Sequence, residues 1–344
     1  MVWQVIGQNR AVSLLERSLK TGSLAHAYLF VGPAHVGKMT LALNLAQALN
    51  CEAAEPPCGE CLACQKIASV KHADIQVIVL NGETSEENRT KISVEQIEEL
   101  QHSASLPPFE GKCKIFIIDG AEFLSTGAAN RLLKTLEEPV GKVVFVLLTV
   151  DDKLLLPTIV SRCQRVELFQ TPANQIEAAI KTKWGVEPEK AKLLSRLAHG
   201  CPGWAISASR DDAPVQQRAE WLDRLLDIGS ADAEERFAFA AQLATRFGQN
   251  RGLVYGQLDL WLDWWHDLLQ VKVGSIDSVT NIDRIDTLTS LVDNLSLGQI
   301  RSFIQSLQAA GVQLRQNASP RLVLEVLMLD IPEVGNQSEV KSAA

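Results

Sequence analysis

Residues 32–39 read GPAHVGKM, a glycine-rich loop that follows an apolar run at 27–31. Loops of the form G-x-x-x-x-G-K-[ST] hold phosphates with backbone N–H groups and the lysine, and they bind Mg²⁺ through the final hydroxyl. Met39 replaces that hydroxyl here, and a soft thioether is a poor ligand for a hard cation. Thr40 comes next, but one step along a helix is a rotation of about 100°, so its hydroxyl points elsewhere. The candidate nucleotide contacts of the loop are Gly32, Gly37, Lys38 and Thr40.

A second part of such a site is expected at residues 114–119, which read KIFIID. This apolar run is typical of a buried parallel strand, and it would deliver Asp119 to a metal at its carboxyl end. In many ATPases a glutamate follows that aspartate and polarises the attacking water, whereas Gly120 follows here. Glu122 is expected in the turn beyond the strand. The two losses together predict a site that does not hydrolyse nucleotide.

Four of the seven cysteines lie within fourteen residues, with the spacing C-x6-C-x2-C-x2-C. Closely spaced thiolates in a loop that contains Gly and Pro are typical of a tetrahedral Zn²⁺ site. Because sulfur would fill all four positions, the metal would be structural and not catalytic. An iron–sulfur cluster and unliganded thiols are the alternatives. The predicted zinc ligands are Cys51, Cys58, Cys61 and Cys64.

Apolar periodicity predicts alternating strands and helices over the first 167 residues. Strands are expected at 27–31, 75–79, 114–119 and 143–149, and helices at 11–22, 40–49, 94–105 and 126–136. This alternation predicts a three-layer α/β domain with a mostly parallel sheet.

Helical patterns replace the strand signals beyond Phe169. The interpretation is an α/β domain at 1–167 with the cysteine module inserted at about 51–64, a small helical lid at 168–208, an all-α domain at 209–332 and a disordered tail at 333–344. Three tryptophans of one amphipathic helix are expected in its core, with a protein interface as the alternative; they are Trp261, Trp264 and Trp265.

Composition is that of an ordinary soluble protein. The chain has 344 residues, 46% of them hydrophobic, and a net charge of −8. This charge argues against a free-standing nucleic-acid binder, which normally presents a basic face. The first residues lack the features of a signal peptide and no run approaches 18 apolar residues, so we expect a cytoplasmic protein without a membrane segment.

Several segments resemble one family along nearly the whole chain. Besides the loop and the cysteines, they are WQVIGQ (3–8), HAYLF (26–30), ANRLLKTLEEP (129–139), LPTIVSRC (156–163) and PRLVLE (320–325). The chain is similar to the delta prime subunits of the bacterial DNA polymerase III clamp loader, which belong to the AAA+ superfamily. The resemblance implies an α/β P-loop domain, a helical lid and a helical collar, which match the three segments described above.

The resemblance also implies partners and a role. Subunits of this family sit in a hetero-pentameric ring with motor (tau/gamma) and delta subunits, and the ring loads a sliding clamp onto primed DNA. Within Ser161-Arg162-Cys163, Arg162 would act in trans on the ATP site of the neighbouring motor, where a guanidinium neutralises charge on the γ-phosphate.

Departures from the motor subunits indicate an accessory subunit of the polymerase holoenzyme without ATPase activity of its own. Besides Met39 and Gly120, His35 stands where motors tend to have glycine, and the segment 200–205 lacks the arginine that touches ATP in motors. Binding of ATP or ADP stays open, because Lys38 survives. Two alternatives remain: a self-sufficient motor subunit that holds Mg²⁺ through Thr40 or water, and a zinc-dependent nucleic-acid binder.

Overall fold

The computed structural model describes residues 2–80, 91–137 and 141–332. They divide into two compact units. The first contains the described residues up to Glu187 together with Ala198–Ile206, and the second contains Pro188–Leu197 and the described residues from Ser207 onward. The predicted tail at 333–344 and the end of the 129–139 segment lie outside the described residues.

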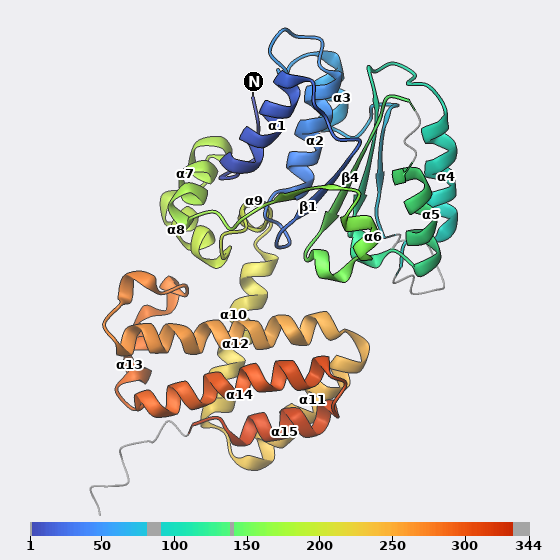
Figure 1. Cartoon of the computed structure of the whole chain (residues 1–344). Coiled ribbons are helices and arrows are strands. Elements are labelled where there is room, and N and C mark those ends of the chain that lie inside the picture. Colours follow the sequence, from blue (N-terminus) through green and yellow to red (C-terminus); the bar gives the residue numbers. More distant parts are fainter. Residues whose placement is uncertain (1, 81–90, 138–140, 333–344) are drawn as a thin grey trace, which may run out of the picture. The chain divides into compact units, whose positions relative to one another are not determined.

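A parallel sheet lies at the centre of the first unit, with five strands among the described residues in the order β2-β3-β4-β1-β5 (Figure 1). In the register, Val31 of β1 pairs with Thr149 of β4, and Asp119 of β3 pairs with Leu148 of β4. The carboxyl ends of β1 and β3 therefore flank that of β4 at one edge of the sheet. The strands are β1 (Ala27–Val31), β2 (Ile75–Ile78), β3 (Lys114–Asp119), β4 (Val143–Thr149) and β5 (Gln164–Glu167).

Helices cover both faces of this sheet (Figure 1). Phe116 and Ile118 of β3 face the core shared with α4 and α5, while Ile115 and Ile117 face the core shared with α1 and α2. Successive side chains of a strand point to opposite faces, so a continuous apolar run is what two covered faces require. The predicted three-layer α/β fold is confirmed.

The helices of the first unit lie close to the expected ranges. They are α1 (Asn9–Thr21), α2 (Lys38–Asn50), α3 (Leu62–Ala68), α4 (Val94–Ser105), α5 (Thr126–Glu137), α6 (Pro157–Val160), α7 (Ala173–Trp184) and the start of α9 (Pro202–Arg210). The sequence patterns did not predict α3, α6 or β5. Each is short, and β5 buries only Val166, so none of them gives a periodic signal.

The second unit is helical. Its helices are α8 (Pro188–Leu197), α10 (Ala213–Ser230), α11 (Ala233–Gln249), α12 (Arg251–Lys272), α13 (Ile285–Val292), α14 (Leu297–Arg315) and α15 (Pro320–Leu329). Trp261, Trp264 and Trp265 of α12 are buried in its core, which confirms the packing interpretation over the interface.

The residues assigned from sequence to a separate lid, 168–208, are shared between the two units. The division into three domains stays a prediction. In the part of the chain that the structure describes, no helix combines the length and the apolar character needed to cross a membrane.

Candidate functional site

The phosphate loop connects the carboxyl end of β1 to the first residue of α2, as predicted. Gly37 caps α2 with a φ of 110°, a conformation that favours glycine. At Gly32 a Cβ would lie 2.6 Å from the Leu168 carbonyl oxygen, so a side chain has no room there. The loop thus presents the N-terminus of α2 at the sheet edge, which is the arrangement that binds anions in phosphate loops.

Lys38 and Asp119 both reach this edge. The Lys38 Nζ donates hydrogen bonds to the carbonyl oxygens of Gly32 (2.5 Å) and Pro33 (2.8 Å). Burial lowers the pKa of Lys38, although Asp119 opposes this shift. Burial likewise raises the pKa of Asp119, and the charge of Lys38 opposes it. The structure therefore brings the predicted lysine and aspartate into one electrostatic site.

The two residues after Lys38 face different surroundings. Met39 is half-buried and packs against the core between α2 and the sheet, while Thr40 is exposed. A thioether thus occupies the position at which a working loop has a metal-binding hydroxyl.

Thr40 contributes to a cavity of about 620 Å³ beside the loop. Such a volume is typical of small-molecule sites. Three segments line the cavity: the N-terminal residues Val2, Gln4, Val5 and Ile6; the loop residues Val36, Gly37 and Thr40; and Lys183, Trp184, Pro202, Gly203 and Ile206 from α7 and α9.

Gly120, the residue after Asp119, has a left-handed backbone with φ of 75°. A Cβ at this position would lie 2.7 Å from Cδ2 of Phe123. A glutamate at position 120 would therefore strain the local backbone as well as crowd Phe123.

Glu122 lies three residues after Asp119 and interacts electrostatically with both Lys38 and Asp119. It lies in a 3₁₀ turn, η1 (Ala121–Phe123), and its charge contributes to the raised pKa of Asp119. Its Oε2 is buried, and no described residue offers it a hydrogen-bond partner. A carboxylate thus remains near Lys38, although not at the position that follows the aspartate.

The start of α9 packs directly on the phosphate loop. The Gly203 N–H donates to the carbonyl oxygen of His35 at 2.8 Å, and a Cβ at Gly203 would lie 2.8 Å from that same oxygen. His35 itself has a φ of 60°. This contact was not expected from the sequence, whose only signal was the Gly-Cys-Pro-Gly punctuation at 200–203.

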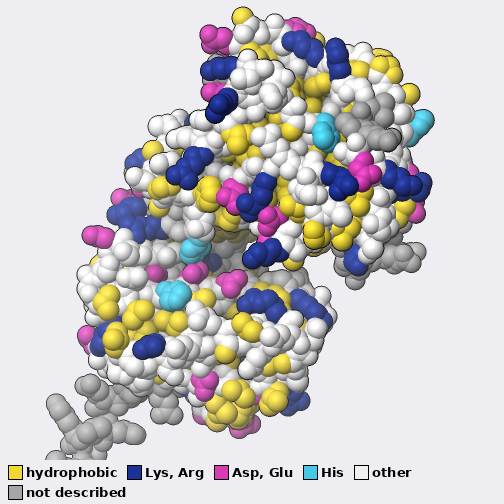
Figure 2. Space-filling view, in the orientation of Figure 1, with side chains coloured by type: hydrophobic (Ala, Val, Ile, Leu, Met, Phe, Trp, Pro, Cys, Tyr) yellow, Lys and Arg dark blue, Asp and Glu magenta, His cyan; other side chains and the backbone are white. Residues whose placement is uncertain are grey.

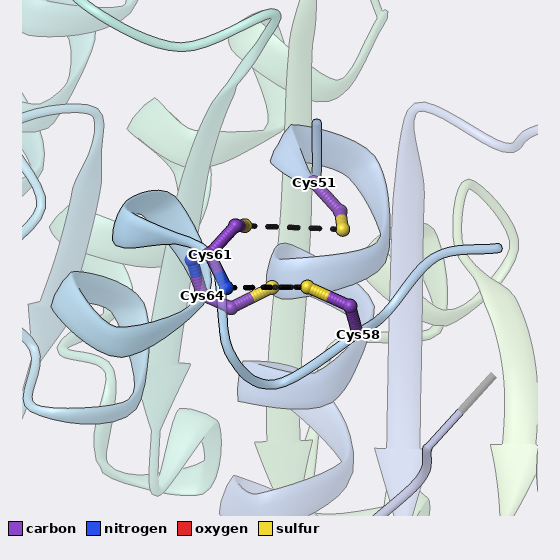
Figure 3. A group of neighbouring side chains, drawn as sticks. All are labelled: Cys51, Cys58, Cys61 and Cys64. Carbon is purple, nitrogen blue, oxygen red and sulfur yellow. Dashed lines mark hydrogen bonds between the residues drawn. The ribbon is translucent and has the colours of Figure 1, made fainter. Parts of the chain in front are cut away.

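The four cysteines form one cluster, and their sulfur atoms all lie within 4.8 Å of one another (Figure 3). The Cys51 and Cys61 sulfurs are 4.0 Å apart, and those of Cys58 and Cys64 are 3.9 Å apart. With a Zn–S bond of about 2.3 Å, the edge of a tetrahedron is about 3.8 Å. The donor set and its spacing therefore fit a tetrahedral metal ion.

Backbone N–H groups point at two of these sulfurs. Cys61 and Glu60 donate to the Cys58 Sγ at 3.3 and 3.4 Å, and Cys64 donates to the Cys61 Sγ at 3.5 Å. These backbone donors lower the pKa of Cys58 to about 6, whereas burial raises that of Cys64 to about 12. N–H donors to sulfur are the kind of outer contact that orients metal ligands.

Arg162 lies just after α6, on the surface of the first unit. Its Nη2 pairs with the Glu137 Oε1 at 2.5 Å, and its Nη1 donates to the Thr158 carbonyl oxygen at 2.9 Å. One third of the side chain is exposed. Glu137 belongs to the motif at 129–139, so the two motifs of the sequence analysis meet at this ion pair.

A family model described as "DNA polymerase III, delta subunit" matches residues 7–172, which include the phosphate loop, the cysteines and Arg162. DNA polymerase III subunit delta' of Bacillus subtilis is 29% identical over 95% of this chain and 96% of its own length. The chain is thus similar, along nearly its whole length, to a clamp-loader subunit of DNA polymerase III.

Two further similar proteins differ in how much of the chain they match. DNA polymerase III subunit tau of Salmonella typhimurium is 36% identical over 59% of this chain, but the match spans about a third of that relative (32%). A solved structure of a gamma subunit-related protein from Thermotoga maritima aligns with 93% of this chain and 99% of its own, at 16% identity and a TM-score of 0.44.

Proposed function

We propose that this clamp-loader protein is a delta prime-type subunit, a non-hydrolysing member of a cytoplasmic hetero-pentameric ring. With motor (tau/gamma) and delta subunits it would load the sliding clamp onto primed DNA. The observation that carries this proposal is the paired loss at Met39 and Gly120, in a chain that matches a delta' relative along nearly its whole length. The loss affects turnover and leaves the fold of the domain intact.

The chemistry of the site supports the absence of hydrolysis. A nucleotide-bound Mg²⁺ needs oxygen ligands, and Met39 offers a sulfur atom. The Lys38 amine is engaged by two carbonyl oxygens of its own loop. Lys38 and the backbone of the loop would still allow ATP or ADP to bind without being cleaved, which a titration with a fluorescent nucleotide measures.

Arg162 would act as an arginine finger in the ATP site of the neighbouring motor subunit. An arginine finger acts at the γ-phosphate of a neighbouring subunit, so it must lie on an exposed surface and be held in place. Arg162 meets both conditions, because it is partly exposed and is fixed by Glu137 and Thr158. In the ring, its ion pair with Glu137 would orient the guanidinium toward the adjoining motor.

The four cysteines would hold a structural Zn²⁺. Four sulfur ligands leave no open position for water or substrate, so the metal would order the segment from Cys51 to α3. Zinc content of at least about one equivalent is expected in protein prepared without chelator, and well under one equivalent would contradict the assignment.

Arg162→Ala tests the donor role in a reconstituted ring. We expect the ATPase rate of the neighbouring site to fall by about 10³-fold or more, because arginine fingers contribute on that scale. Arg165→Ala is the matched control, since Arg165 is a nearby exposed arginine that pairs with Asp152 and Glu167. An unchanged rate in the Arg162 variant would refute the donor role.

One observation favours a motor subunit as the alternative function. Glu122 places an unpartnered carboxylate oxygen near Lys38 and Asp119, where it could polarise water in place of the glutamate missing at Gly120. Steady-state phosphate release by the isolated chain separates this alternative from the proposal.

A zinc-dependent nucleic-acid binder is less well supported. On the face drawn in Figure 2, Lys and Arg side chains are interspersed with Asp and Glu side chains. This mixture agrees with the net charge of −8 and offers no broad basic surface in that view.

A further inference from the structure

Helix α2 runs from the phosphate loop to the cysteine module, and two buried amide side chains lie on one of its faces. Asn44 and Gln47 are each 2% exposed. The Asn44 Nδ2 donates to the Gln47 Oε1 at 2.9 Å. Buried amides of this kind need partners at both ends, because an unmade hydrogen bond in the interior is costly.

The outer ends of this pair reach two different parts of the first unit. The Asn44 Oδ1 accepts from the backbone N–H of Gln4 at 2.8 Å, and the Gln47 Nε2 donates to the backbone carbonyl of Cys64 at 2.9 Å. The result is a continuous relay from Gln4 through Asn44 and Gln47 to Cys64. A second link runs in parallel, since the Val2 N–H donates to the Pro57 carbonyl oxygen at 2.8 Å.

The relay has only one consistent direction. The backbone N–H of Gln4 requires an acceptor, which is the side-chain oxygen of Asn44. The Asn44 amide NH2 group is then free to donate to the side-chain oxygen of Gln47, and the Gln47 amide NH2 group must donate to the Cys64 carbonyl oxygen. Reversing either amide would set donor against donor or acceptor against acceptor at both of its ends, so the chain of contacts fixes all four groups together.

Both ends of the relay have a defined place in the sites described above. Cys64 is one of the four clustered cysteines. Gln4 lies in the N-terminal segment whose residues Val2, Gln4, Val5 and Ile6 form one wall of the cavity beside the phosphate loop. A metal that fixes the cysteines would therefore also fix that wall.

We propose that Asn44 and Gln47 are positioning residues that transmit the metal state of the cysteine module to the cavity wall. When the metal is bound, Cys64 is held and the segment 2–6 stays in place. When it is lost, the relay loses its fixed end and the wall loosens. The inference rests on the proposed metal and is independent of the role of the chain in the ring.

Hydrogen exchange of the full-length chain, followed by mass spectrometry over the N-terminal peptide, tests the relay. Gln47→Met removes both of its polar links at similar size. We expect the exchange of the Gln4 amide to accelerate by about tenfold or more in this variant with zinc still bound, and by a similar factor in the parent protein after metal removal with a chelator. Gln257→Met, which changes a buried amide of the second unit, is the matched control and should leave the peptide unchanged.

A merely structural effect would behave differently. If Gln47→Met only weakened the domain, exchange would also accelerate in β3, whereas the relay predicts a change confined to the N-terminal segment. An unchanged Gln4 amide in Gln47→Met would overturn the proposal, and so would an unchanged N-terminal peptide in metal-free protein. If Gln47→Met does not fold, the chelator arm on the parent protein still decides the matter.

Discussion

Two glycines show that the differences from motor subunits extend into the backbone. At Gly120 a Cβ would lie 2.7 Å from Phe123, and at Gly203 it would lie 2.8 Å from the His35 carbonyl oxygen. Gly120 also has the left-handed conformation, which favours glycine. The backbone conformation at these two positions therefore leaves no room for a catalytic glutamate at 120 or for a longer side chain at 203.

This argument predicts that restoring the consensus residues does not restore hydrolysis. In the Met39→Thr, Gly120→Glu double variant we expect no Mg²⁺-dependent phosphate release above that of the parent chain. We also expect a loss of roughly 1–3 kcal/mol in the free energy of unfolding, because a non-glycine residue is strained at φ of 75°. Met39→Thr alone is the control; it should be inactive and should lose less stability than the double variant, because Met39 is only half-buried and its backbone is not strained. Rapid turnover by the double variant would contradict the account.

Asp74 fixes the loop that leads into β3. Its carboxylate accepts hydrogen bonds from the backbone N–H groups of Phe109 (2.7 Å), Glu110 (2.9 Å) and Gly111 (2.7 Å). Burial alone would raise the pKa of Asp74, but these three donors outweigh it and hold the pKa below its usual value. The charged carboxylate is therefore the form that stabilises the fold.

We expect Asp74→Asn to lower the free energy of unfolding at pH 7 by about 1–3 kcal/mol, since an amide cannot accept all three bonds. A lowered pKa contributes stability that is present above the unfolded pKa of about 4 and is lost as the pH falls through the folded pKa. The difference between variant and parent should therefore shrink below about pH 4. Denaturation at pH 7 and pH 3 checks this, with exposed Asp293→Asn as the control; a gap as large at pH 3 as at pH 7 would be inconsistent with it.

At the scale of elements, Arg236 of α11 ties together the ends of two helices in the second unit. Its buried guanidinium donates to the carbonyl oxygens of Ile228 and Gly229 near the end of α10, and to those of Met328 near the end of α15 and Ile331 just beyond it. Carbonyl oxygens at helix C-termini lack intrahelical partners and carry partial negative charge. A buried arginine supplies both the hydrogen-bond donors and the positive charge that these carbonyl oxygens need.

Arg236→Met should destabilise the helical unit by about 2–3 kcal/mol, because it removes four charge-assisted hydrogen bonds to carbonyl groups near the helix ends. Tryptophan fluorescence during denaturation reports mostly on this unit, since it contains four of the seven tryptophans, including Trp261, Trp264 and Trp265 in its core. Arg301→Met, at an exposed position of α14, should have little effect. Equal stability of the two variants would mean that the hydrogen bonds of Arg236 do not stabilise the helical unit.

The long periodic elements could be predicted from sequence, and the irregular contacts could not. Apolar runs placed β1, β3 and β4 correctly because strands buried on both faces are continuously apolar. The cysteine spacing likewise predicted the cluster that the structure shows. The approach of Glu122 to Lys38, the packing of Gly203 on His35 and the amide relay all depend on tertiary geometry, for which sequence spacing carries no signal.

At the scale of the whole molecule, two kinds of site share one α/β unit. The nucleotide-like site has kept its loop, lysine and aspartate, but it lacks the metal-binding hydroxyl and the adjacent glutamate. The arginine at 162 and the cysteine cluster retain the residues that their proposed roles need. In the proposed role, an accessory ring subunit needs the arginine that acts on a neighbouring ATP site. It does not need the groups that would hydrolyse a nucleotide bound to its own loop.

Phosphate release by the isolated full-length chain, measured with ATP at saturating Mg²⁺, tests this account most directly. We predict no release above the rate of uncatalysed hydrolysis, and no stimulation by primed DNA. Turnover at about 1 s⁻¹ or faster, in the range typical of enzymes, that also disappears in Lys38→Ala would contradict it and would favour the motor assignment.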